Sequence, residues 1–243
     1  MTVAHVAAKD YFCVTASCDE LYTICYDKVM RYDPVDKQWY RIAPGPEIQC
    51  KWAGVCEWMG DIYVIGGNSV RMSKRFSTDT CEWTDLPLMN MTRYYPGVGV
   101  LRGKIFVIGG LDGQWSPLRD CEYYNPNTNT WANIPRMKTA RWSLGVAVLR
   151  NKLYAIGGNH RVEQYANSVE VYDMDSDSWV RKTAPLNYGR RCLGVAVVNG
   201  FIYVVGGRSA GTIEYYNEDL NEWKVIGSVK ACCNFGCVAL RLI

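Results

Sequence analysis

Three arginines recur at one spacing in this chain, each four residues before a glycine that opens an apolar run. They are Arg93 before Gly97, Arg141 before Gly145 and Arg190 before Gly194. A guanidinium group offers a planar fork of donors that fits carboxylate and phosphate oxygens. The spacing therefore predicts an arc of three equivalent cations, suited to an acidic or phosphorylated ligand.

The residue types needed for catalysis are scarce. The chain has 2 His, His5 and His160, and no Ser or Cys nucleophile motif accompanies His160. A copper site needs several converging His or Tyr ligands. The paired glycines of the chain lack the Walker and Rossmann spacings that cradle phosphates. We therefore expect no catalytic residues, no metal and no cofactor.

The cysteine pattern indicates an intracellular protein, and the overall charge bears on the class of partner. The 11 Cys are odd in number and irregularly spaced, which predicts reduced thiols, and Cys232-Cys233 do not suggest a zinc site. The apolar runs are shorter than a bilayer span, and the start of the chain lacks a signal-peptide pattern. A net charge of +3 does not favour nucleic acid. We expect a cytoplasmic location, with the nucleus and the cytoskeleton also open, and neither nucleic acid nor membrane as partner.

One short sequence motif recurs along the whole chain: an apolar run that ends in two glycines. It occurs as Ile62–Gly67, Ile105–Gly110, Leu153–Gly158 and Ile202–Gly207, with a weaker copy at Leu21–Tyr26 that lacks both glycines. Recurrence at this period is the signature of a repeat architecture.

Each repeat contains four strand signals. A small apolar strand, a second apolar strand ending in Gly-Gly, an alternating third strand and a short fourth strand follow one another, as in residues 145–183. An aromatic residue precedes a Trp by seven residues in every copy, at Tyr32, Phe76, Tyr124, Tyr172 and Tyr216. This fixed hairpin predicts that one four-stranded unit is copied, with the five Trp residues packing between units.

The double glycine, the aromatic followed by Asp or Asn, and the Trp together resemble the Kelch repeat. The resemblance covers about residues 11–240 and implies an all-β fold, a β-propeller of four-stranded antiparallel blades. The expected domain is a single propeller over residues 1–243, with repeats at about 11–46, 52–90, 95–137, 143–186 and 192–229 and a closing strand at about 234–241. The first copy departs most, at Cys25-Tyr26, and the second departs at Phe76–Asp79.

The sequence predicts one more inner strand than it predicts second, third or fourth strands. Six are expected, at Cys13–Ala16, Ala53–Glu57, Gly97–Leu101, Gly145–Leu149, Gly194–Val198 and Gly236–Leu240. Because the C-terminal strand of Kelch propellers commonly completes the first blade, a six-bladed parent is expected. A closed five-bladed ring is the alternative.

In a propeller, the loops after Gly-Gly and the loops that lead into each inner strand share one face. Here both sets of loops carry more Lys and Arg than Asp and Glu, which predicts a basic face. Peptide-binding Kelch propellers hold ligands at these positions, so the resemblance implies a set of partner-binding residues. They are Asn68, Arg71, Arg93, Gln114, Trp115, Arg141, Asn159, Arg161, Tyr165, Arg190 and Arg208.

The chain resembles the Kelch domain of BTB–Kelch proteins, the substrate-receptor arm of cullin-RING ubiquitin ligases. The resemblance implies a non-catalytic module that binds an acidic or phosphorylated protein segment. Cullin-RING components would be reached through BTB and BACK regions that this chain does not contain. The alternatives are an actin-binding or cytoskeletal Kelch scaffold and a Kelch-type propeller enzyme, which the scarcity of His disfavours.

Overall fold

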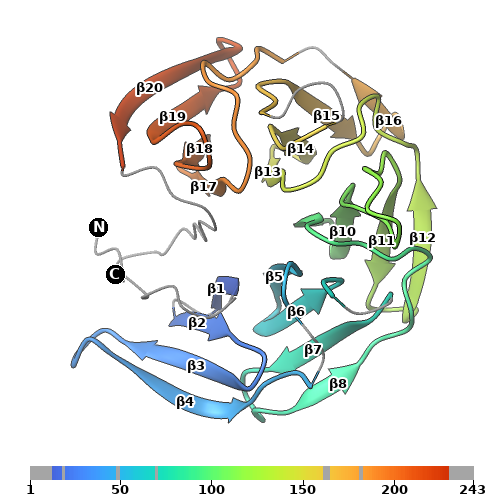
Figure 1. Ribbon diagram of the computed structural model, residues 1–243, viewed down its shortest axis with the longest axis vertical. Helices are drawn as coiled ribbons and strands as arrows, with labels where there is room; N and C mark the ends of the chain where they lie inside the picture. Colours follow the sequence, from blue (N-terminus) through green and yellow to red (C-terminus); the bar gives the residue numbers. More distant parts are fainter. Residues whose placement is uncertain are drawn as a thin grey trace.

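The fold is a set of β-sheets arranged as blades around a central axis (Figure 1). The computed structural model describes residues 13–17, 20–47, 50–68, 71–160, 165–180 and 183–229. Within these ranges every regular element is a strand, and the strands form five four-stranded antiparallel sheets. The predicted all-β propeller of four-stranded blades is confirmed. The predicted closing strand at 234–241 lies outside the described residues.

The blades follow one another along the chain. The first contains β1 (Cys13–Ser17), β2 (Glu20–Ile24), β3 (Lys28–Asp33) and β4 (Gln38–Pro44). The second contains β5 (Gly54–Trp58), β6 (Asp61–Ile65), β7 (Ser73–Ser77) and β8 (Trp83–Asp85). The third contains β9 (Gly97–Leu101), β10 (Lys104–Ile108), β11 (Cys121–Asn125) and β12 (Thr130–Ile134). The fourth contains β13 (Gly145–Leu149), β14 (Lys152–Ile156), β15 (Val169–Asp173) and β16 (Ser178–Val180), and the fifth contains β17 (Gly194–Val198), β18 (Phe201–Val205), β19 (Thr212–Asn217) and β20 (Glu222–Ser228).

In the second to fifth blades, the repeated Trp joins its blade to the one before it. In every blade it lies directly opposite the aromatic residue of the third strand; in the fourth blade, the ring centroids of Tyr172 and Trp179 are 5.4 Å apart. The indole Nε1 of Trp179 donates to the carbonyl of Pro135 in the preceding blade at 2.8 Å. The other indole donors make the equivalent bond, from Trp83 to Pro44, Trp131 to Pro87 and Trp223 to Ala184. The predicted blade-packing role of these four Trp residues is confirmed.

Small residues on the inner strands allow the blades to meet at the axis. A Cβ added to Gly54, Gly97 or Gly145 would overlap a valine of the next blade, respectively Val98, Val146 and Val195. A glycine of one inner strand therefore packs directly against a valine of the next inner strand. Close packing of this kind leaves no room for a larger side chain.

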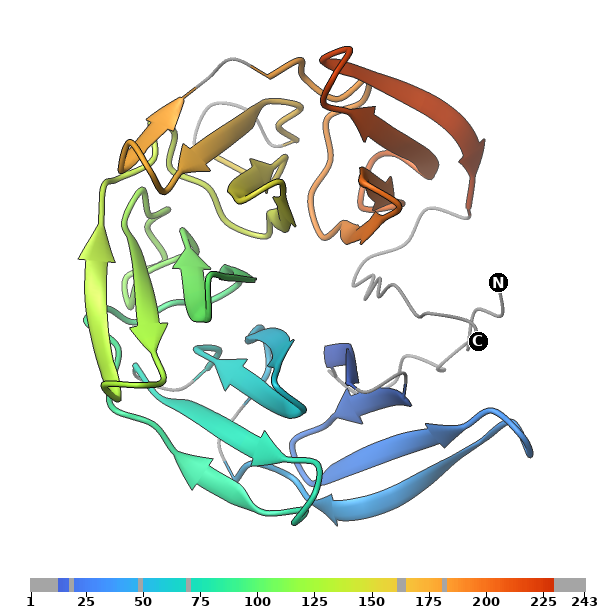
Figure 2. The same ribbon diagram turned by 180° about the vertical axis from the view of Figure 1, so that it is seen from behind.

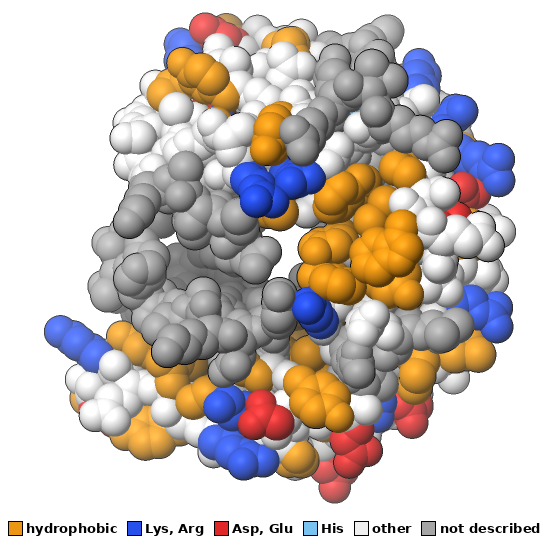
Figure 3. Space-filling model, viewed as in Figure 1, with side chains coloured by type: hydrophobic (Ala, Val, Ile, Leu, Met, Phe, Trp, Pro, Cys, Tyr) orange, Lys and Arg blue, Asp and Glu red, His pale blue; other side chains and the backbone are white. Residues whose placement is uncertain are grey.

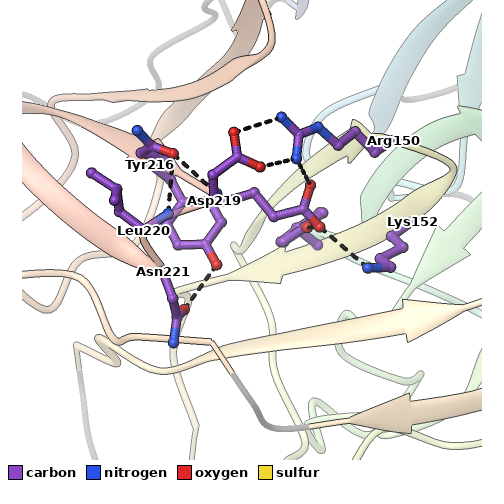
Figure 4. A network of polar contacts seen from close by, with 9 residues as sticks. Arg150, Lys152, Tyr216, Asp219, Leu220 and Asn221 are labelled. Carbon is purple, nitrogen blue, oxygen red and sulfur yellow. Dashed lines mark hydrogen bonds and ion pairs between the residues drawn. The ribbon is translucent and has the colours of Figure 1, made fainter.

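Surface ion pairs run from the turn between the first and second strands of one blade to the turn between the third and fourth strands of the next. Arg150 of the fourth blade donates to Asp219 of the fifth, with Nη2 and Oδ2 2.9 Å apart, and lies 3.5 Å from Glu218 (Figure 4). Lys152 Nζ reaches the same Glu218 carboxylate at 3.2 Å. Arg102 occupies the equivalent turn of the third blade and contacts Asp175 of the fourth at 2.6 Å.

The described blades form an arc whose two end blades stand apart. The inner strands β1, β5, β9, β13 and β17 pack in that order, and both ribbon views separate the β1–β4 blade from the β17–β20 blade (Figure 2). Within the described residues, Trp39 of the first blade has no hydrogen bond to another blade of the kind that Trp179 makes. A further blade would supply that acceptor, so the six-bladed parent stays our prediction and the five-bladed ring its alternative.

Candidate protein-interaction face

The three repeat arginines are buried inside their blades. The side chains of Arg93, Arg141 and Arg190 have 0% exposure. Each pairs with an equally buried glutamate on the third strand of its own blade. Arg93 Nε lies 2.9 Å from Glu122 and Arg141 Nη2 lies 3.0 Å from Glu170, while Arg190 pairs with Glu214. The expectation that these arginines contact a partner is therefore wrong, because their charges are neutralised within the fold.

Each guanidinium also braces the double glycine of its blade. Arg141 Nη1 donates to the carbonyls of Gly157 at 2.9 Å and Ser168 at 2.8 Å. The carbonyl of Arg141 accepts from the amide of Gly110 in the preceding blade at 2.8 Å. Arg141 thus holds the Gly-Gly segment of its own blade and that of the preceding blade. Burial lowers the pKa of the Arg190 guanidinium, and Glu214 opposes that shift.

The second blade shows that arginine and glutamate change together. Its equivalents of Arg93 and Glu122 are Cys50 and Lys74. Cys50 is buried, and burial raises the pKa of its thiol to about 11. Lys74 pairs instead with Asp85 at 3.1 Å. The Lys74 charge is thus paired, and Cys50 brings no cation to this position. The glutamate that recurs two residues before Tyr124, Tyr172 and Tyr216 was the sequence signal for the buried pairs, and our prediction overlooked it.

The residues that directly follow each arginine are half-buried rather than fully buried. Tyr94, Trp142 and Arg191 directly follow Arg93, Arg141 and Arg190. Each is bridged in antiparallel fashion to the loop after its Gly-Gly, with Leu111, Asn159 and Arg208 as the respective partners. Backbone bonds then link successive blades, from Tyr95 N to Trp52 O at 2.8 Å and from Ser143 N to Tyr95 O at 3.0 Å. The two sets of loops therefore form one continuous face.

Five aromatic rings form a row across this face, and we call them the aromatic row: Trp52, Tyr94, Tyr95, Trp115 and Trp142. Tyr94 and Trp115 stack with centroids 4.8 Å apart and planes within 8°. Trp52 stacks on Tyr95 at 5.1 Å and meets Trp115 edge-on at 5.5 Å. Tyr95 continues the row to Trp142 at 5.4 Å. Three blades contribute to the row, and Trp115 is 53% exposed.

Cations lie beside two rings of the aromatic row. Lys51 Nζ is 4.5 Å from the centroid of the Trp52 ring. The Arg191 guanidinium lies 5.2 Å from Trp142 and 5.4 Å from Tyr165. Cation–π contacts of this kind fix the charged groups beside the rings. Figure 3 shows hydrophobic side chains gathered beside the central axis, with Lys and Arg side chains at their border.

The remaining predicted residues divide into three groups. Trp115, Tyr165 and Arg208 belong to the aromatic row or its basic border, where Arg208 is exposed. Asn68, Arg71 and Gln114 are exposed on the loops after Gly-Gly, whereas Asn159 is only 7% exposed. Arg161 lies outside the described residues. The rings Trp52, Tyr94, Tyr95 and Trp142 were not predicted, although their position beside the repeat arginine or its counterpart Cys50 could have indicated them. Lys51 and Arg191 belong to the loops predicted to be basic but were not among the predicted partner-binding residues.

The described residues contain no group of three or more His, Cys, Asp or Glu arranged to hold a metal ion. No helix long and apolar enough to cross a bilayer occurs in the same part of the chain. The face offers rings, guanidinium and ammonium groups and backbone amides. These groups are suited to binding a ligand.

A propeller of four-stranded blades with an aromatic and basic loop face is the architecture of a Kelch-type interaction module. Residues 54–228 match the family described as the KLHDC2/KLHL20/DRC7 Kelch-repeats domain, and the chain belongs to that family. The match runs from the second blade through the fifth.

Curated relatives agree with the family assignment. The chain is 41% identical to Kelch-like protein 24 of Rattus norvegicus over 190 residues, which is 76% of this chain and 30% of that protein. It is 39% identical to Kelch-like protein 28 of Mus musculus over 102 residues, 37% of this chain and 18% of that protein. The chain therefore spans less than a third of the length of these relatives.

A solved structure shares the fold. The structure titled "Structure of YjhT" superposes with a TM-score of 0.68 at 14% identity, covering 77% of this chain and 68% of that one. At this identity the likeness concerns the fold alone.

Proposed function

We propose that this Kelch domain is the target-recognition module of a ubiquitin-ligase adaptor and that it holds an acidic or phosphorylated segment of its target on the loop face. The observation that carries the proposal is the aromatic row with the cations Lys51 and Arg191 beside its rings. Large exposed apolar patches on a folded domain mark interaction sites. Tyr, Trp and Arg are also the residues that dominate binding energy at protein interfaces.

The acidic character of the target follows from the surface cations rather than from the buried arginines. Arg191 and Lys51 border the aromatic row, and Arg208 is exposed beside Arg191. Ammonium and guanidinium groups at the edge of an apolar patch attract carboxylates and phosphates and raise the rate of encounter. Basic groups at the rim are thus matched to an acidic target.

The ligase role rests on the resemblance to BTB–Kelch proteins and on the family of the relatives. Kelch-like protein 24 and Kelch-like protein 28 share the propeller region with this chain. An F-box/kelch-repeat protein of Arabidopsis thaliana is 39% identical over 75 residues, 28% of this chain and 16% of that protein. We propose that cullin-RING components are reached through regions outside this domain.

Charge reversal on the face tests recognition directly. Proteins captured by the wild-type domain would be compared with those captured by a Lys51→Glu/Arg208→Glu variant. The matched control is Lys37→Glu/Lys224→Glu, which changes the same net charge at two exposed positions away from the face. We expect the face variant to lose the captured partners and the control to keep them, with equal melting temperatures for all three proteins.

The ligase role needs its own measurement in cells. We expect the full-length protein to co-purify with a cullin and the abundance of captured partners to rise when the protein is depleted. Partners that bind equally to the face variant would overturn recognition on this face. Retention of the wild-type domain on actin filaments, without a cullin, would favour the cytoskeletal alternative.

A further inference from the structure

The aromatic row is rigid before any ligand arrives, because its rings contact one another. Trp115 stacks on Tyr94, and Trp52 meets both of these rings edge-on. Each of the three rings, which come from two blades, therefore contacts the other two. A ring held by its neighbours loses little conformational freedom when a ligand binds. Preorganised aromatic surface of this kind favours the capture of an apolar side chain.

Trp115 owes its place to a carboxylate in its own loop. The Oδ1 atom of Asp112 accepts hydrogen bonds from the amides of Gln114 and Ser116, each at 2.8 Å. The amide of Trp115 donates to the Asp112 carbonyl at 3.0 Å. These bonds hold Trp115 at φ 61°, a backbone conformation that bulky residues rarely adopt. Backbone strain of this kind often coincides with binding sites.

The cations beside the row add a second requirement. Lys51 lies over Trp52, the ring that also contacts Tyr94, Tyr95 and Trp115, and Arg191 lies between Trp142 and Tyr165. Positive charge beside these rings attracts carboxylates. A purely acidic ligand would leave Trp115 exposed.

We propose that the face recognises an extended segment in which a large apolar side chain is flanked by acidic residues. The apolar side chain packs against Trp52, Tyr94 and Trp115, and the carboxylates turn toward Lys51 and Arg191. Asp112 is a positioning residue for Trp115. This proposal rests on the proposed recognition function and specifies the class of segment that the face takes.

A displayed library of random short peptides, selected on the wild-type domain, would reveal the segment. We expect enrichment of sequences with Trp, Phe, Tyr, Leu or Ile next to Asp or Glu. One selected peptide would then be measured by fluorescence anisotropy in three forms: the parent, a form with its apolar residue changed to Ser, and a form with its acidic residues changed to their amides.

The variants Trp115→Ser and Asp112→Ala test the two roles separately. Trp115→Ser should weaken the parent peptide on the order of tenfold or more and remove its advantage over the Ser form. Asp112→Ala keeps the ring but frees its loop, so it should weaken the parent peptide by a smaller factor. Tyr40→Ser removes another exposed ring, on the outer strand β4, and should leave binding unchanged. Melting curves report whether each variant is folded.

The outcomes separate this inference from the proposed function. Acidic peptides that bind through Lys51 and Arg208 but ignore Trp115→Ser would overturn the inference and leave acidic recognition standing. If apolar peptides bind equally to the wild type and to the charge-reversal variant, the acidic requirement of both proposals is wrong. If no peptide is enriched, or if bound peptides are indifferent to every variant of the face, both proposals fail.

Discussion

Arg141 Nη2 lies 3.0 Å from the carboxylate of Glu170, and neither side chain has any exposure to solvent. The two residues lie 29 positions apart in the chain. The pair ties the loop that enters β13 to the strand β15, and it recurs in the neighbouring blades. The repeat arginines therefore hold the loops that carry the candidate site, and we propose that the residues after them face the ligand.

Removing one partner of this pair should destabilise the domain strongly. Arg141→Ala leaves Glu170 buried without its cation, and breaking such a pair typically costs about 3–5 kcal/mol. Denaturant unfolding would measure the loss. Arg150→Ala is the control, since Arg150 forms an exposed ion pair with Asp219, and we expect its unfolding midpoint to stay near that of the wild type.

Replacing both partners should recover part of that stability. Arg141→Met/Glu170→Leu removes both buried charges, so that neither is left without its partner. Recovery should be incomplete, because the Glu170 carboxylate also accepts hydrogen bonds from the amides of Lys138 and Thr139. A double variant no more stable than Arg141→Ala would contradict the role that we assign to charge pairing.

The repeated Trp residues should differ in their contribution to stability. Trp179 is buried at 5% exposure and bonds to the preceding blade, so Trp179→Ala should cost about 3–5 kcal/mol. Trp39 is half-buried and has no such bond within the described residues, so Trp39→Ala should cost clearly less. Equal losses, measured by unfolding of the same 243-residue chain, would argue that Trp39 also packs against a neighbouring blade.

The first glycine of each pair is required by both geometry and space. Gly157 has φ 61°, and an added Cβ would lie 2.7 Å from the carbonyl oxygen of Arg190. Gly157→Ala should therefore destabilise the domain by more than about 1 kcal/mol. Gly113→Ala is the matched control, because nothing lies within 4 Å of its added Cβ. A near-neutral Gly157→Ala would show that the blade interface can shift to accept the methyl group.

Alkaline pH should weaken the fold through its packed tyrosines. Burial raises the pKa of Tyr63 and of Tyr216 from 10.0 to about 12 in each case. The unfolded chain releases these protons near pH 10, while the folded chain keeps them until about pH 12. Stability should therefore be intact below pH 10 and fall between about pH 10 and about pH 12.

Unfolding midpoints measured across that pH range, with tyrosinate absorbance followed in parallel, would test this dependence. Tyr63→Phe/Tyr216→Phe should flatten the decline, because two of the shifted groups are gone. Tyrosinate formation at the ordinary pKa while the domain stays folded would show that these hydroxyl groups reach solvent.

Local sequence determined the blade. The seven-residue interval from Tyr172 to Trp179 fixes a hairpin, and alternation in residues 169–172 fixes the faces of its third strand. The glycines of the inner strands and of the Gly-Gly pairs follow from steric demands that recur in four of the five copies. Such signals act over a few residues and repeat, so fold class and the joining role of Trp could be predicted.

Only the tertiary structure decided which basic residues remain at the surface. Whether Arg141 turns outward or inward depends on Glu170, which the chain brings beside it only when the blade forms. The aromatic row likewise joins Trp52, Tyr94 and Trp142 from three successive blades, and only the packing of those blades brings the rings into contact. Composition could predict a basic loop face, but burial and pairing, which are properties of packed blades, determined which of its charges remain at the surface.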